Sequence, residues 1–154
     1  MARGGAGLTD QKLNPSKPIL GYSDISTVKL DLDEMPFKMA KYWALRTMEW
    51  FRLRGFIILK SSTNHYHVLF NRSVTWKKNV HVMAWVCLES KNKELMRWFL
   101  MQCIKESSTL RVSPKKEKLS PRVVFRNGIQ DIEIKIFLAW RKRITSTLKN
   151  KQPE

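Results

Sequence analysis

Alternating apolar and polar residues predict the main strands of this chain. One strand is expected over residues 28–33, with an aliphatic side and a charged side formed by Val28, Leu30 and Leu32 against Lys29, Asp31 and Asp33. Two apolar runs within residues 56–70, separated by a short Ser/Thr/Asn stretch, predict a β-hairpin. Because side chains alternate between faces along a strand, His65 and His67 should lie on one face with Leu69, opposite Tyr66, Val68 and Phe70.

Apolar residues at steps of three and four predict the helices. One helix should begin after Pro36, run through Phe51 and end at Gly55. Residues 75–88 fit either a strand or a helix capped by Thr75, and a helix is favoured. A clearer helix is expected up to residue 105, after a cap at Asn92, and residues 131–144 are either a strand or, slightly favoured, a terminal helix.

Short strands over residues 109–112 and 122–126 complete the expected elements, the second closed by a turn at Asn127 and Gly128. The resulting order, β-α-β-β-α-β, predicts a ferredoxin-like, RRM-like α+β sandwich, in which an antiparallel sheet has helices on one face and the other face open. Because the first and third strands are neighbours in this topology, we expect four polar side chains together on the open face: Asp31, Asp33, His65 and His67.

The chain of 154 residues is long enough for one domain with a substantial core. We predict a flexible leader over residues 1–24, a single RRM-like domain over 25–144 and a basic, frayed tail over 145–154. Cys87 and Cys103 are too few for a cysteine-based metal site, and we interpret them as reduced core residues of a cytoplasmic protein. Since no apolar run reaches 18 residues, no membrane span is expected.

The strongly positive charge changes this picture by indicating a partner. The 29 Lys and Arg residues against 13 Asp and Glu give a formal charge of +16, which favours a polyanion, with nucleic acid ahead of a membrane surface. Trp76, beside two lysines, is a candidate for stacking on a base. The candidate phosphate contacts follow the basic loop over 113–121 and its flanking strands: Arg111, Lys115, Lys116, Lys118, Arg122 and Arg126.

Asp31 and Asp33 form the main candidate site for chemistry. Two carboxylates at positions i and i+2 of one strand can reach the same divalent ion, and Mg²⁺ accepts one or two carboxylates together with phosphate oxygens. A nearby imidazole and hydroxyl groups would hold the phosphates of a nucleotide. This division of roles is that of metal-dependent nucleotidyl transfer, with Mg²⁺ or Mn²⁺ as the ion.

The order of these motifs resembles the archaeo-eukaryotic primase superfamily over roughly residues 28–112. Leu30-Asp31-Leu32-Asp33 matches its first motif, an alternation of hydrophobic and Asp residues, and Ser61, Ser62 and His67 loosely match its second, a Ser-x-His set in a hairpin. The resemblance implies a third, later acid, for which Asp131 or Glu133 is available. It also implies roles for the residues: metal binding by Asp31, Asp33 and Asp131, catalysis by the aspartates with His67, and nucleotide contacts by His67, Ser61, Ser62 and His65.

A second resemblance is to the HUH endonucleases of rolling-circle replication, whose His-hydrophobic-His metal motif is matched by His65-Tyr66-His67. Those enzymes need a tyrosine nucleophile on a later helix, and this chain has no tyrosine after Tyr66. We therefore expect a nucleic-acid-binding replication protein, either a primase-like nucleotidyltransferase or a primase-associated subunit. The alternatives are an HUH-type protein without its tyrosine and a non-catalytic basic nucleoprotein subunit. The expected partners are single-stranded or primer–template nucleic acid and other replication proteins.

Overall fold

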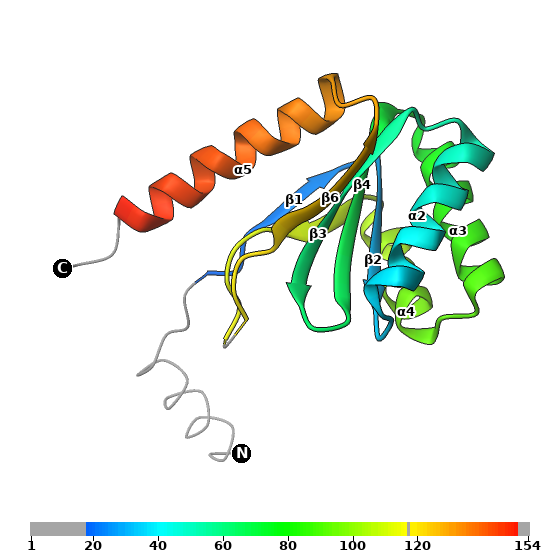
Figure 1. The fold of residues 1–154 in the computed structure, drawn as a ribbon, viewed down its shortest axis with the longest axis horizontal. Helices are drawn as coiled ribbons and strands as arrows, with labels where there is room; N and C mark the ends of the chain where they lie inside the picture. Colours follow the sequence, from blue (N-terminus) through cyan, green and yellow to red (C-terminus); the bar gives the residue numbers. More distant parts are fainter. Residues whose placement is uncertain (1–17, 117, 151–154) are drawn as a thin grey trace, which may run out of the picture.

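The computed structural model describes residues 18–116 and 118–150, which form an α+β sandwich of the ferredoxin-like kind (Figure 1). The elements follow in the order β1 (Gly21–Asp24), β2 (Thr27–Asp33), α2 (Phe37–Phe51), β3 (Gly55–Ser62), β4 (His65–Ser73), α3 (Trp76–Ser90), α4 (Lys93–Lys105), β5 (Ser108–Arg111), β6 (Arg122–Gly128) and α5 (Ile132–Asn150). The fold class predicted from the alternation of strands and helices is confirmed.

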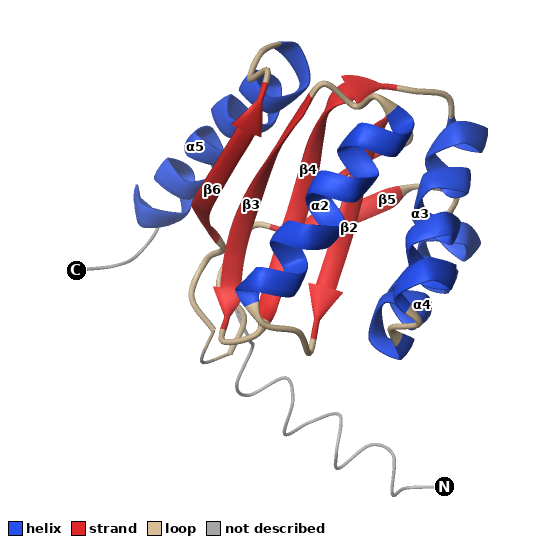
Figure 2. Ribbon diagram, turned by 45° about the vertical axis from the view of Figure 1, so that its right-hand side comes forward, coloured by secondary structure: helices blue, strands red, loops and turns tan. Residues whose placement is uncertain are grey.

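A four-stranded antiparallel sheet in the order β2-β4-β3-β6 forms the centre of the fold (Figure 2). The predicted first and third strands, β2 and β4, are neighbours, as the ferredoxin-like topology requires. The predicted fourth strand, β5, does not join this sheet but pairs with the unpredicted strand β1 in a separate two-stranded sheet. Strand β6 instead extends the main sheet beyond β3 and forms one of its edges.

Helices α2, α3 and α4 cover one face of the sheet and enclose the larger core (Figures 1 and 2). Alternate residues of the hairpin, Tyr66, Val68 and Phe70, face this core as predicted. Side-chain caps define the beginnings of two helices, since Thr75 accepts from the Lys78 N–H and Asn92 accepts from the Leu95 N–H. The Asn92 amide also donates to the Asp33 carbonyl at 3.0 Å, which fixes the end of β2 against α4.

The opposite face of the sheet, expected to be open, carries a smaller core against α5. Ile57, Leu59 and Leu69 pack there against Ile134 and Phe137 of the helix, so residues 131–144 adopt the favoured helical alternative. Helix α5 continues to Asn150, six residues beyond the predicted domain end at 144, and β1 lies inside the range predicted as a leader. Residues 1–17 and 151–154, the rest of the predicted leader and tail, lie outside the described residues.

Two predictions of where the chain reverses its direction are wrong. Helix α2 ends at Arg52, whose φ of 54° places it in the left-handed region, and Gly55 is the first residue of β3. Asn127 and Gly128 do not form a hairpin turn, since they pair with Phe56 and Gly55 as the last residues of β6. Gly128 is nevertheless required there, because its φ is 71° and an added Cβ would lie 2.4 Å from the Arg54 carbonyl oxygen.

Across residues 18–116 and 118–150, no helix has the length and hydrophobicity that a bilayer span requires. Cys87 is buried and Cys103 is half-buried, and both are free thiols.

Candidate functional site

The register of β2 and β4 brings the four predicted polar residues together. Asp31 lies directly opposite His67, and Asp33 lies directly opposite His65. Directly opposed residues of an antiparallel pair point to the same face of the sheet. This is the face opposite α2–α4, since Leu69 of the same alternating set belongs to the smaller core. The prediction that neighbouring first and third strands would bring these side chains to one face is confirmed.

The two Asp–His pairs have different geometry. His65 Nδ1 lies 2.8 Å from Asp33 Oδ1, a hydrogen bond between half-exposed side chains. An ionised carboxylate can only accept, so Nδ1 is the donor in this contact. His67 Nε2 lies 3.6 Å from Asp31 Oδ1, which is too long for a hydrogen bond. Asp31 Oδ1 is buried and has no hydrogen-bond partner, although the side chain as a whole is 21% exposed.

Burial opposes ionisation of both Asp31 and His67, and a neighbouring charge adds to this effect at each residue. Burial raises the pKa of Asp31 well above its usual value, and the charge of Asp33 raises it further, against the lowering effect of the Arg111 and Lys118 charges. Burial also lowers the pKa of His67 to about 4, and the positive charge of Arg111 acts in the same direction. At neutral pH His67 is therefore a neutral imidazole, suited to hydrogen bonding rather than to carrying charge.

The neutral state of His67 should make acid destabilise the protein. Because the pKa of His67 is lowered in the folded state, its contribution is present above pH 6.5 and lost as pH falls towards 4. A shift of this size corresponds to about 3 kcal/mol. We expect His67→Gln to reduce the loss of unfolding free energy between pH 7 and pH 4 by up to that amount, measured by urea titration. Asp31 acts in the opposite direction in both the wild type and the variant. If the unfolding free energy of the two proteins falls equally between pH 7 and pH 4, the prediction is wrong.

The tight turn of the β3–β4 hairpin adds hydroxyl groups to one end of the site. Asn64 adopts a φ of 61° in this turn, a conformation that Asn tolerates better than most residues. Ser62 lies opposite His65, and its Oγ is buried without a partner. Ser61 Oγ donates to the His65 carbonyl at 3.4 Å. Of the two predicted serines, Ser62 is thus placed on the His65 side with a free hydroxyl, and Ser61 contacts the turn backbone.

Part of the predicted basic track borders the site. Arg111 and Lys118 are close enough to affect the ionisation of both Asp31 and His67. The Arg111 guanidinium donates to the Ser113 carbonyl and, at 3.3 Å, to the Leu119 carbonyl, so it holds the two ends of the basic loop together. Lys115 and Lys118 pair through their backbones across the loop.

The other predicted phosphate contacts lie further along the track. Lys116 is an exposed residue of the basic loop, and Arg122 and Arg126 are exposed on edge strand β6. The six predicted side chains therefore do not form one cluster. They extend from the Asp–His site through the loop to the edge of the sheet.

The structure does not bring Asp131 to the aspartate pair, so its predicted role as a third metal ligand is not supported by its position. Asp131 lies at the start of α5, where it accepts from Asn71 Nδ2 at 2.7 Å and pairs with Arg54 at 3.0 Å. Asn71 is four residues from His67 on β4, about 13 Å along the strand. The resemblance implied a third acid on a strand, but Asp131 directly precedes helix α5.

Asp31 and Asp33 provide oxygen atoms that suit a divalent ion. The unpartnered, buried Oδ1 of Asp31 and the carboxylate of Asp33 are two hard oxygen donors on one face, which is the number Mg²⁺ usually takes from protein when phosphates complete its shell. Across residues 18–116 and 118–150, no group of three or more His, Cys, Asp or Glu side chains is arranged as a metal site. An ion here would therefore take its remaining ligands from substrate or water.

The chain has three tyrosines, at positions 22, 42 and 66. Tyr66 points into the larger core, Tyr42 is exposed on α2, and the Tyr22 ring packs against Phe137 and Trp140.

Sequence reasoning missed Lys29, which it placed on the polar face with the aspartates. The side chain is completely buried, and its Nζ contacts Asp24 at 2.7 Å and Ser108 Oγ at 3.0 Å. Lys29 thus joins the small sheet to β2, next to the candidate site. The only sequence signal was an Asp five positions earlier, which has no meaning before strand β1 is known.

No protein-family model matches the chain, and neither the curated proteins nor the solved structures provide a match.

Proposed function

We propose that this protein is a nucleic-acid-binding, metal-dependent nucleotidyltransferase of the primase-like kind. The observation that carries the proposal is the β2–β4 register, which sets Asp31 opposite His67 and Asp33 opposite His65 on one face of the sheet. Positive charge from Arg111 and Lys118 borders that face. Paired carboxylates, hydrogen-bond donors and nearby cations are groups that phosphoryl chemistry uses.

Each group has a role that follows from its chemistry. Asp31 and Asp33 would hold Mg²⁺ or Mn²⁺, which supplies charge neutralisation at the reacting phosphate when bound. His67, neutral at pH 7, would donate a hydrogen bond to a phosphate oxygen of the nucleotide. Ser62 and His65 border the same surface and would contact the nucleotide, and Arg111 and Lys118 would offset the charge of its phosphates.

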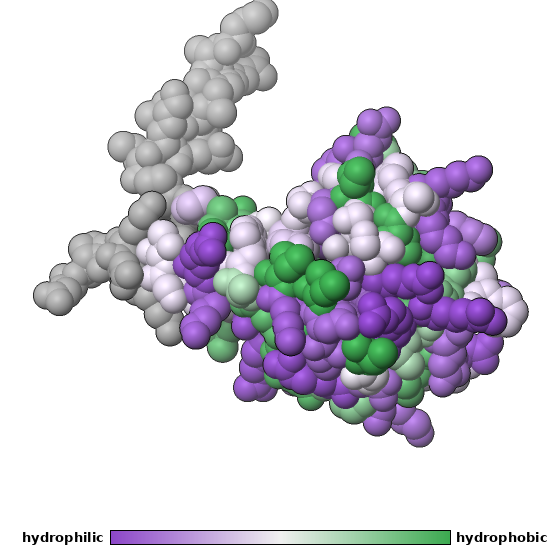
Figure 3. All heavy atoms as spheres, turned by 90° about the horizontal axis from the view of Figure 1, so that it is seen from above, coloured by the Kyte–Doolittle hydropathy of each residue, from purple (hydrophilic) through white to green (hydrophobic). Residues whose placement is uncertain are grey.

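The net charge of +16 supports a nucleic-acid partner for the same protein. The view from above the fold shows hydrophilic side chains over much of the surface, with separate apolar patches among them (Figure 3). We place the protein in the cytoplasm with other replication proteins. A primase-associated subunit without turnover is the alternative that the same surface would serve.

Template-directed incorporation of nucleotides tests the proposal. The full chain should extend or initiate a strand on single-stranded DNA or RNA template in Mg²⁺ or Mn²⁺, measured by incorporation of labelled nucleotide. Omitting the metal should abolish the product. If the protein retains template on a filter at low salt but incorporates nothing, alone or with replication partners, the catalytic proposal is wrong and the accessory role replaces it.

A further inference from the structure

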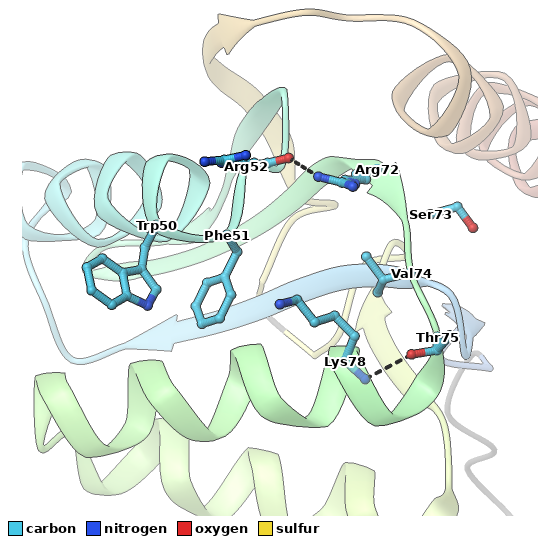
Figure 4. A pocket seen from close by; sticks show the side chains of 8 residues that line it. All are labelled: Trp50, Phe51, Arg52, Arg72, Ser73, Val74, Thr75 and Lys78. Carbon is cyan, nitrogen blue, oxygen red and sulfur yellow. Dashed lines mark hydrogen bonds between the residues drawn. The ribbon is translucent and has the colours of Figure 1, made fainter.

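A second basic surface lies away from the Asp–His site, in a hollow between the end of α2, the end of β4 and the start of α3 (Figure 4). Its volume is about 790 Å³, and its lining includes Trp50, Phe51, Arg52, Arg72, Thr75 and Lys78. Arg72 is five residues beyond His67 on β4, about 17 Å along the strand. The hollow is therefore a separate site.

Positive charge converges on the hollow from three elements. Arg52, Arg72 and Lys78 line it, and none of its lining residues is acidic. The Arg72 guanidinium donates to the Arg52 carbonyl at 2.6 Å, which orients it, and the Lys78 ammonium lies 5.0 Å from the centre of the Phe51 ring (Figure 4). The N-terminus of α3 adds its partial positive charge, and its first turn contains no acidic residue.

An exposed aromatic ring borders the same hollow. Trp50 is 67% exposed, and its indole stacks on Trp85 with the ring planes 9° apart and the centroids 5.9 Å apart. Trp85 in turn meets Phe51 edge to face. Trp50 is thus a braced, solvent-facing ring beside three cations. Trp76, the tryptophan predicted to stack on a base, packs partly against the larger core instead.

We propose that this hollow binds single-stranded nucleic acid. Arg72, Lys78 and the α3 N-terminus hold backbone phosphates, and a base stacks on Trp50. An acidic peptide would use the cations but has no group that requires the braced indole. This inference rests on the nucleic-acid-binding half of the proposed function and is independent of the Asp31–Asp33 pair.

Anisotropy of a labelled ten-nucleotide oligothymidylate, titrated with the full chain, tests the site. Trp50→Ala should weaken binding roughly 5- to 100-fold, the usual range for loss of one stacked base. The aromatic control Tyr42→Ala, on the same helix, should change it less than about twofold, since it removes no stacked base. Arg72→Ala/Lys78→Ala should reduce the salt slope of log K by about 1.4, and the control Lys38→Ala/Lys93→Ala should leave the slope unchanged. Thermal melts establish that each variant is folded.

The outcomes separate this inference from the proposed function. If the hollow variants bind like their controls while wild type binds tightly, the hollow is not the site, and incorporation can still stand. If wild type incorporates nothing but Trp50→Ala still weakens binding, the hollow stands and the catalytic proposal fails. Displacement of the oligonucleotide by polyglutamate, with no effect of Trp50→Ala, would overturn the assignment in favour of an acidic peptide.

Discussion

Replacing Asp31 and Asp33 together by asparagine is expected to abolish nucleotide incorporation and to raise the unfolding midpoint by a few degrees. The lost activity follows because asparagine cannot neutralise a divalent ion. The gain in stability follows because burial and the Asp33 charge raise the pKa of Asp31. A carboxyl with a raised pKa contributes stability at low pH that is lost as pH rises through that value. The stabilising effect of asparagine should therefore be large at pH 7 and small near pH 4.

Thermal melts at the two pH values, with incorporation assays on the same samples, check both halves of this result. Glu34→Gln is the control, because it makes the same carboxylate-to-amide change at the exposed residue after Asp33. It should keep wild-type incorporation. An inactive but more stable double variant would exclude misfolding as the cause of inactivity. Wild-type turnover in the double variant would mean that the active site lies elsewhere.

Replacing Asp24 by alanine is expected to lower the free energy of unfolding by about 3 kcal/mol, because it leaves a buried ammonium without its counter-ion. Lys29 is completely buried, and Asp24 is its only carboxylate partner among the described ion pairs, at 2.7 Å. The value lies at the lower end of the range for broken buried pairs because Asp24 is itself 25% exposed. Burial lowers the pKa of Lys29, and the hydrogen bond and charge of Asp24 oppose that effect.

Lys29→Met provides the comparison, since it removes the charge and keeps most of the side-chain volume. It should cost less than about 1 kcal/mol, and in the double variant it should recover most of the loss caused by Asp24→Ala. Urea unfolding of the four proteins forms a double-mutant cycle. Lys29 Nζ also donates to the Thr27 carbonyl at 3.2 Å and to Ser108 Oγ at 3.0 Å. If Lys29→Met destabilises as much as Asp24→Ala, the loss comes from these hydrogen bonds rather than from an unpaired charge.

The candidate site was accessible from the sequence because it follows from local periodicity and one topological rule. The alternation of apolar and polar residues predicted which face each side chain lies on. The pairing of the first and third predicted strands then brought together Asp31, Asp33, His65 and His67. Asp131, the third acid implied by the resemblance, lies apart from Asp31 and Asp33. Its segment forms the helix that the sequence slightly favoured, with Ile134 and Phe137 packed against the sheet. The buried state of Lys29 depends on pairing between strands far apart in sequence, which no local pattern records.

Chain reversals were predicted less well for a related reason. Glycine was expected at two reversals, at Gly55 and at Asn127–Gly128. Instead Arg52, Lys91 and Glu106 occupy left-handed positions at the ends of three helices. Each of these residues has a Cβ that disfavours such a conformation, and the packing of the helix and of the element that follows it compensates for that cost. Local preference therefore marks where a reversal is easy, and tertiary contacts decide where it occurs.

The edge position of β6 has a consequence for self-association. A free strand edge can pair with the same edge of a second copy and start aggregation. Strand β6 pairs only with β3 among the described strands, and it carries exposed Arg122 and Arg126 near its two ends. An antiparallel approach of two copies would set these arginines against each other, and opposed like charges are unfavourable. The residues predicted to contact phosphate thus also protect the sheet from growth by strand addition.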